Sequence, residues 1–433
     1  MEQGTIREQF RNIVCFFILG YCAFFLGEVI SAATVDIFAG ESTWLSAAVV
    51  TSGLAHVVVK LTLPWVYHKL PYYVKIALLL SFCTAGLVIV VVPNSQGARL
   101  LGMTVFESGR AMAEVVFLSV TAFYGDLALH SFVTGGGLGI VMGAFYYSEP
   151  GTQLHLYFCF AALLTWTCFS PRVTVFFLIP VVFVLPLMYA FLDKFPVKRQ
   201  SKNISFAGVH YHALPDQEER QKTHELSINE KLLVWWSIFM AMAYLFLQFF
   251  ADQLSLQAVI TSLVFPNKSL YLIGHYTYYM LAHNIGRLLG RSYLLIVSVT
   301  CSRVASHVQI KHTWILAALG NALMFWFVFA SWFYLIGDIE VILVLCFMIG
   351  VLSGSTYTNS LSVVGEQITD VKEREFALGV LTLGSAAGMY AAGLLGLYLK
   401  PYLAHHCLID LELGEACVST FLNMSGWTTN ARC

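Results

Sequence analysis

The sequence predicts an all-α polytopic membrane protein with a major-facilitator-like fold, in which two helical halves surround a polar centre. Of its 433 residues, 58% are apolar and only 11% are charged, too few charges to cover a soluble protein of this size. Apolar runs that approach or exceed the roughly 20 residues needed to cross a bilayer recur along the chain. A polar stretch near the middle divides these runs into two groups.

About eleven membrane spans are expected, six before and five after the polar stretch. They cover residues 13–33, 45–67, 73–93, 98–124, 128–148, 173–192, 232–251, 271–299, 313–336, 339–364 and 376–399. The chain therefore divides into an N-terminal half at 1–192, a central loop at 193–231, a C-terminal half at 232–399 and a divergent tail at 400–433. Two helical halves joined by a polar loop are typical of major-facilitator transporters.

The basic residues orient these spans, because cytosolic loops are enriched in Lys and Arg. With the N-terminus in the cytosol, the basic central loop is cytosolic and the sequon Asn267-Lys268-Ser269 is luminal, which makes Asn267 the expected glycosylation site. The tail is then also luminal, where Asn423 is a second candidate and Cys407 is placed to pair with Cys417. The apolar run at 154–169 is short for a span, and it is expected to be re-entrant, interfacial or packed on the luminal face.

Charged residues inside the expected spans indicate the functional site. Glu107, Arg110 and Glu114 follow each other at i, i+3 and i+7 and share one helix face. An unpaired charge at bilayer depth costs about 2.5–3.5 kcal/mol or more, so this face is expected to point into the bundle. The trio is either a structural ion pair or the wall of a cavity, and Glu114 is its functional candidate because it has no basic partner at i+3 or i+4.

Three more charges lie in or at the ends of other spans. Glu28 lies in the first span, next to small residues that permit close helix approach. Lys60, in the second span, either reaches a carboxylate or extends its ammonium to the membrane interface. Asp252 lies at the luminal end of the seventh span.

The eighth span carries a polar stripe. In HYTYYMLAHNIGRLLGR, Tyr279, His283, Arg287 and Arg291 each follow the previous one by four residues and lie on one side of a helix. Two guanidinium groups one turn apart suit a phosphate or carboxylate, which Arg binds through two parallel hydrogen bonds. The alternative is that the two arginines only serve at a helix end.

No pattern indicates an enzyme, a cofactor or a nucleic-acid partner. The chain has no phosphate-binding P-loop, no HExxH and no GxSxG, and its ten cysteines show no CxxC or zinc spacing. A net charge of −1 gives no reason to expect nucleic-acid binding. No catalytic residue and no metal ligand are predicted, and the expected partners are the lipid bilayer and a small solute.

Several segments resemble the battenin family of lysosomal membrane proteins. They are AEVVFLSVTAFY at 113–124, KEREFALGVLTLGSAAGMYAAGLLGL at 372–397, HVVVKLTLPW at 56–65 and FFADQ at 249–253. The resemblance extends from about Asn12 to Leu399. It implies a major-facilitator-like fold in lysosomal or vacuolar membranes, with roles in lysosomal pH homeostasis, basic amino-acid balance and clearance of glycerophosphodiesters from the lumen.

The resemblance also carries family residues onto this chain, at Glu114, Asp252, Lys60 and Arg291. At the positions of Glu107 and Arg110, by contrast, the family has small polar residues. Family members often end in a prenylation motif, whereas this chain ends Asn-Ala-Arg-Cys, which does not suit that signal. In the central loop, Tyr211 and Leu214 fit a tyrosine-based sorting signal for trafficking adaptors.

Together these features favour a lysosomal or vacuolar transporter that exports an anionic solute such as a glycerophosphodiester. Arg287 and Arg291 are expected to hold the anion, while Glu114, Asp252 and Lys60 form a gate or a proton-coupling network. Two alternatives stay open. One is a basic amino-acid or proton-linked transporter whose carboxylates bind the substrate. The other is a membrane scaffold that recruits trafficking factors through the central loop.

Overall fold

The computed structural model describes residues 2–38, 42–66, 70–147, 170–192, 226–260, 274–301, 304, 307–411 and 427. Every regular element in these ranges is a helix, and nine helical segments are long and apolar enough to cross a membrane. The helices α4 (Gln96–Thr121) and α13 (Gly274–Thr300) are also long enough, but they are more polar because they carry intramembrane charges. With these two, the described residues contain the eleven spans expected.

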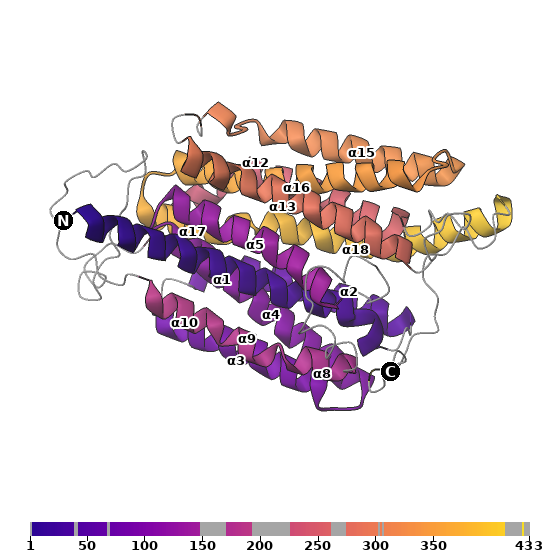
Figure 1. The fold of residues 1–433 in the computed structure, drawn as a ribbon, viewed down its shortest axis with the longest axis horizontal. Helices are drawn as coiled ribbons and strands as arrows, with labels where there is room; N and C mark the ends of the chain where they lie inside the picture. The colour runs from indigo at the N-terminus through magenta and orange to yellow at the C-terminus, as the bar shows by residue number, and fades with distance from the viewer. Residues whose placement is uncertain are drawn as a thin grey trace.

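The N-terminal half consists of six spans that lie side by side (Figure 1). They are α1 (Glu2–Ile37), α2 (Ser42–Val66), α3 (Tyr72–Val91), α4, α5 (Asp126–Tyr147) and a sixth span made of α8 (Pro171–Phe176), α9 (Ile179–Val182) and α10 (Val184–Phe191). The sixth span is interrupted near Pro180 and Pro186, which have no N–H to donate to a helical hydrogen bond.

The C-terminal half begins with a capping box. Ser227 Oγ accepts the Glu230 N–H at 3.3 Å, while the Glu230 carboxylate accepts the Ser227 N–H at 2.6 Å, so the helix starts four residues earlier than expected. The helices of this half are α12 (Ile228–Leu254) with the π-helical turn η2 (Ser255–Val259), α13, α15 (Thr313–Phe333), α16 (Ile339–Gln367), α17 (Val371–Leu381) and α18 (Leu383–His405) with the turn η4 (His406–Asp410).

The pairing of helices in one half repeats in the other. Helix α1 packs along α5 as α12 packs along α18, and α2 packs along α4 as α13 packs along α16. The two halves meet through α5 against α13 and through α2 against α18. Such repeated halves around a central interface are the architecture of major-facilitator transporters, so the predicted fold class is confirmed. The division at 193–231 stays a prediction, because residues 193–225 lie outside the described ranges.

Glycines allow the closest of these contacts. A Cβ on Gly135 of α5 would lie 1.9 Å from the carbonyl oxygen of Phe17, and one on Gly139 would lie 2.3 Å from that of Tyr21. Because the two glycines are four residues apart, they form one face on which the α1 backbone rests. The small-residue stretch of α5 thus holds α1 in place, and α1 carries Phe24, a residue of the site described below.

The C-terminal tail reaches the end of the bundle opposite to the start of α1. There the Trp427 ring is buried near the guanidinium of Arg99, and its carbonyl oxygen accepts the N–H of Arg172 at 3.3 Å. Cys407 is disulfide-bonded. Several expectations concern residues outside the described ranges and stay predictions. They are the sites at Asn267, Asn423, Tyr211 and Leu214, the placement of the run at 154–169 and the pairing of Cys417.

Candidate functional site at the interface of the two halves

Lys60 and Glu114 form a buried ion pair. Nζ of Lys60, on α2, lies 2.8 Å from Oε2 of Glu114, on α4, and the Lys60 residue is only 1% exposed. Lys60 therefore reaches a carboxylate instead of extending to the membrane surface. The other Glu114 oxygen accepts a hydrogen bond of 2.8 Å from the hydroxyl of Tyr357 on α16. Since Tyr357 belongs to the C-terminal half, Glu114 connects the two halves.

Arg291 lies between two aromatic rings at this interface. Its guanidinium carbon is 4.6 Å from the centroid of Phe24, on α1, and 4.4 Å from that of Tyr357. Such cation–π contacts contribute about 2 kcal/mol or more each when water is excluded. Gly136 of α5 leaves room for this arrangement, because a Cβ there would lie 2.6 Å from the Phe24 ring and 3.2 Å from Nη1 of Arg291.

The hydrogen-bonding capacity of Arg291 is largely unused. Its Nε and Nη1 are buried and have no acceptor in the part of the chain that the structure describes. A buried donor without an acceptor costs about 1–3 kcal/mol, and more for a charged group. Arg291 is thus a fixed cation, held by rings on both halves, with donors available for an anion.

Tyr357 contacts both Glu114, through its hydroxyl, and Arg291, through its ring, and the two contacts can be removed separately. We expect Tyr357→Phe to keep the ring against Arg291 but to remove the hydrogen bond to Glu114, which lowers the free energy of unfolding by about 1.5–3 kcal/mol. Tyr357→Leu is expected to lose more, because the ring contact is also removed. Denaturant unfolding of the detergent-solubilised protein measures both changes, and equal losses in the two variants would contradict this separation.

Asp252 is enclosed within the C-terminal half. Its Oδ1 lies 2.7 Å from Nε2 of His283, on α13, and its Oδ2 accepts the hydroxyl of Ser353, on α16, at 2.9 Å. All three residues are buried. Both carboxylate oxygens therefore already have partners on neighbouring helices.

The stripe expected on α13 is only partly brought together. Tyr279 lies in the apolar core of the C-terminal half, with Phe327 and Ile342 among the buried residues of that cluster, and not beside the arginines. Arg287 lies over the ring of Phe249 at 5.9 Å, and Phe249 in turn contacts Tyr357 at 6.0 Å between centroids. Arg287 is therefore next to the Arg291 cradle, with its buried Nε lacking an acceptor among the described residues.

The three charged residues of α4 do not share one partner. Glu107 and Arg110 contact each other and His56, whereas Glu114 pairs with Lys60. Glu107 accepts from Nε of Arg110 at 2.7 Å, and the same Glu107 oxygen lies 2.7 Å from Nε2 of His56, on α2. That His56 nitrogen is also 2.8 Å from Nη2 of Arg110, so it either donates to the carboxylate or accepts from the guanidinium. Arg110 lies against α1 at Gly27, where a Cβ would come within 2.3 Å of its Cδ. Only Glu114 joins Lys60.

The sequence did not predict four residues of the site, His56, Phe24, Ser353 and Tyr357, and only His56 had a local signal. His56 lies four residues before Lys60 on α2, so the two side chains share a helix face. A histidine four residues before an intramembrane lysine was the available signal for its inward position.

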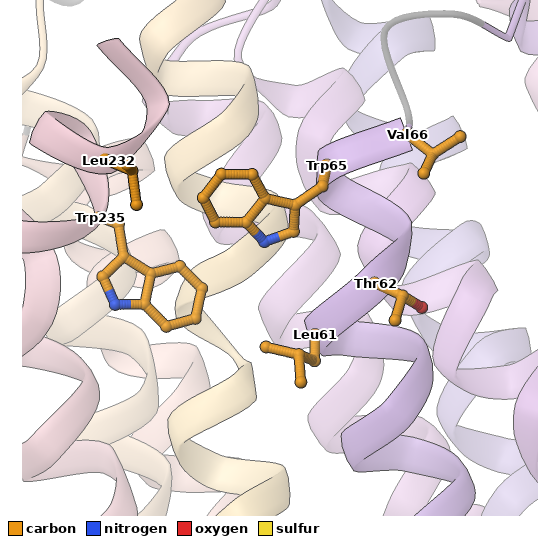
Figure 2. Close-up of a pocket in the computed structure, with 6 residues that line it drawn as sticks. All are labelled: Leu61, Thr62, Trp65, Val66, Leu232 and Trp235. Atoms are coloured by element: carbon orange, nitrogen blue, oxygen red, sulfur yellow. The ribbon is translucent and has the colours of Figure 1, made fainter. Parts of the chain in front are cut away.

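Two spaces among the described residues lie near these charges or near the interface of the halves, and neither is a polar cavity. The space beside Arg110, among Ala23, Leu26 and Phe106, holds no water-sized void. The larger groove, of about 500 Å³, lies between α2 and α12 (Figure 2), and its lining is almost wholly apolar. It is lined by Leu61, Thr62, Trp65, Val66, Leu232 and Trp235. Its exposed leucine and valine side chains suit contact with lipid, and the Thr62 hydroxyl and two indole N–H groups are its few side-chain polar groups (Figure 2).

Cross-half contacts close the end of the bundle at which α1 begins. Nη2 of Arg374, on α17, lies 2.5 Å from Oδ1 of Asp126 at the start of α5. The hydroxyl of Tyr72, on α3, donates to the carboxylate of Glu375. These two contacts hold the halves together at this end of the bundle.

Comparisons with known proteins agree with this architecture. The sequence model of the family described as CLN3 protein matches residues 14–406. The chain is 25% identical to dog (Canis lupus familiaris) battenin, over 91% of this chain and 92% of battenin, and 26% identical to the protein BTN1 of Yarrowia lipolytica, over 88% and 92% respectively. The crystal structure of the human organic anion transporter MFSD10 superposes with a TM-score of 0.55 at 10% identity, covering 96% of each chain.

Proposed function

The chain belongs to the CLN3 protein family, and we propose that it exports small anionic solutes, with glycerophosphodiesters as the substrate class, from the lumen of lysosomes or vacuoles. The observation that carries this proposal is Arg291, a buried cation held between Phe24 and Tyr357 whose Nε and Nη1 have no acceptor among the described residues. An anion bound there contacts both halves at once, as a substrate must if the halves move around it.

The chemistry of a glycerophosphodiester suits this position. Its phosphate has two non-bridging oxygens, which match the parallel donors of a guanidinium group. Arg287, beside the same ring cluster, supplies a second cation one helical turn away. Removal of such anions from an acidic lumen also provides a link to luminal pH homeostasis.

The contacts of the carboxylates weigh against a basic amino acid as substrate. A cationic substrate at Glu114 has to displace Lys60, and one at Asp252 has to displace His283. Each displacement leaves a buried nitrogen without its partner, which is costly inside a membrane. A scaffold role rests on the central loop, most of which lies outside the described residues.

The proposed orientation places the N-terminus in the cytosol. Its basic residues then agree with the positive-inside rule, and the closed end at Asp126 and Arg374 faces the cytosol. The opposite end, with the disulfide at Cys407, then lies in the lumen, and disulfides persist outside the reducing cytosol.

Small-molecule profiling of purified lysosomes tests the proposal. Lysosomes from cells that lack this chain are expected to accumulate glycerophosphodiesters, and the wild-type chain is expected to clear them. Arg291→Gln should fail to clear them, whereas Glu114→Gln should retain partial activity. If Glu114→Gln abolishes activity and Arg291→Gln only weakens it, with a change in basic amino acids in place of phosphodiesters, the amino-acid alternative replaces this proposal.

A further inference from the structure

Glu28 occupies a contact between the two halves that the proposed anion site does not use. It lies on α1, and its Oε1 accepts a hydrogen bond of 3.1 Å from the side-chain amide of Asn284 on α13. Gly143 of α5 gives it room, because a Cβ there would lie 2.8 Å from the Glu28 Cβ. Glu28 therefore belongs to the N-terminal half but is held by a residue of the C-terminal half.

The partner of Glu28 differs from those of the other intramembrane acids. Glu107, Glu114 and Asp252 each have a nitrogen of Arg, Lys or His within 2.7–2.8 Å. Within the described ranges, the hydrogen bond to Glu28 comes from the neutral amide of Asn284. A carboxylate bonded by a neutral amide loses less on protonation than one in a direct ion pair, since no opposite charge is left unpaired.

The groups that face Glu28 come from two packed helices. Arg287 and His283 of α13 and Arg110 of α4 are the charged or titratable side chains that interact with it electrostatically. Arg110 and His283 already have close carboxylate partners, Glu107 and Asp252. Arg287 has no ion pair within 4 Å among the described residues, and it interacts at longer range with two acids, Glu28 and Asp252. Of these two, Asp252 is already paired with His283, whereas Glu28 is bonded by a neutral amide.

We propose that Glu28 is the proton-responsive positioning residue of the transport cycle, and that its carboxylate competes with the transported anion for Arg287. When a luminal proton binds Glu28, the carboxyl group becomes neutral and Arg287 is free to join Arg291 in holding the anion. One proton and one singly charged phosphodiester then move together, and the proton leaves Glu28 on the other side. The combined step carries no net charge. This inference rests on the proposed function.

The test is binding of radiolabelled glycerophosphoglycerol to the purified full-length protein at about pH 5 and about pH 7.5, two values that span the range in which physiological pH switches act. Wild type is expected to bind about tenfold more tightly at the acidic pH, a coupling of ordinary size for two linked sites. Glu28→Gln mimics the protonated acid, so it should bind tightly at both pH values, with a ratio below about twofold.

Two further variants complete the experiment. Arg287→Gln should bind the anion weakly at both pH values, because it lacks the guanidinium group that protonation of Glu28 would otherwise free. This variant tests the inference even if Glu28→Gln does not fold. Glu340→Gln removes an exposed carboxylate at the start of α16 and should keep the wild-type ratio.

The possible results separate the two proposals. A wild-type pH ratio that persists in Glu28→Gln, or tight wild-type binding with no pH dependence, overturns the role of Glu28 and leaves the anion site intact. Absence of wild-type binding at both pH values overturns the proposed function and the coupling together.

Discussion

Arg291→Gln is expected to weaken binding of an anionic glycerophosphodiester by at least about 100-fold, the largest functional effect of any single substitution in this chain. The reason is that two charge-assisted hydrogen bonds, each worth about 1.5–3 kcal/mol, are lost while the rings of Phe24 and Tyr357 stay in place. Equilibrium binding of radiolabelled glycerophosphoglycerol to the purified protein measures the loss.

Two controls make this result specific. Arg291→Lys keeps the charge but not the planar group that stacks between the rings, so its affinity should lie between those of wild type and Arg291→Gln. Arg11→Gln, at an exposed position near the start of α1, should bind like wild type. If Arg291→Gln binds the anion as tightly as wild type, the guanidinium group is structural and the site lies elsewhere.

The largest effect on stability is expected at the buried pair of Lys60 and Glu114. Lys60→Met leaves the Glu114 carboxylate buried with only the Tyr357 hydroxyl as a hydrogen-bond partner among the described residues, which should lower the free energy of unfolding by about 3–5 kcal/mol. Combining it with Glu114→Gln removes the uncompensated charge. The double variant should therefore be more stable than Lys60→Met alone.

A double-mutant cycle measures this coupling by denaturant unfolding of the solubilised protein. A favourable coupling energy of a few kcal/mol between the two substitutions is expected, as for a buried pair in direct contact. If the double variant loses as much unfolding free energy as the two single variants together, Lys60 and Glu114 do not stabilise each other in the folded protein.

The fold was largely predictable from composition and periodicity. Apolar runs and the positions of basic residues predicted the eleven spans, and the charges on α4 and α13 predicted that these helices face the interior. The start of α12 was wrong by four residues because the signal of the capping box, Ser227 with Glu230, was not used. The last span was expected as one helix, but it is divided into α17 and α18 at Thr382.

The pairing inside the site was less predictable. On one helix, Glu107 and Glu114 lie seven residues and about 10 Å apart, too far to share a partner. On α2, His56 and Lys60 lie four residues and about 6 Å apart, so each meets a different acid. Which acid each of them meets depends on how α2 and α4 pack, across more than fifty residues of sequence. No pattern local to either helix contains that information.

The same limit applies between the halves. Spacing on α13 predicted that Arg287 and Arg291 act together, but it contained nothing about Phe24 or Tyr357, the rings that hold Arg291. It also placed Tyr279 with the arginines, whereas the structure places Tyr279 in an apolar core. The stripe from Tyr279 to Arg291 is about 18 Å long, so its parts lie at different depths of the bundle.

Transport by the reconstituted protein tests the central claim most directly. Liposomes that contain the purified wild-type protein are loaded with either unlabelled glycerophosphoglycerol or unlabelled lysine, and uptake of the matching labelled compound is measured in each. The anion site at Arg291 predicts accumulation of labelled glycerophosphoglycerol that Arg291→Gln abolishes, with no accumulation of lysine. Accumulation of lysine without glycerophosphoglycerol would contradict it and transfer the substrate site to the carboxylates.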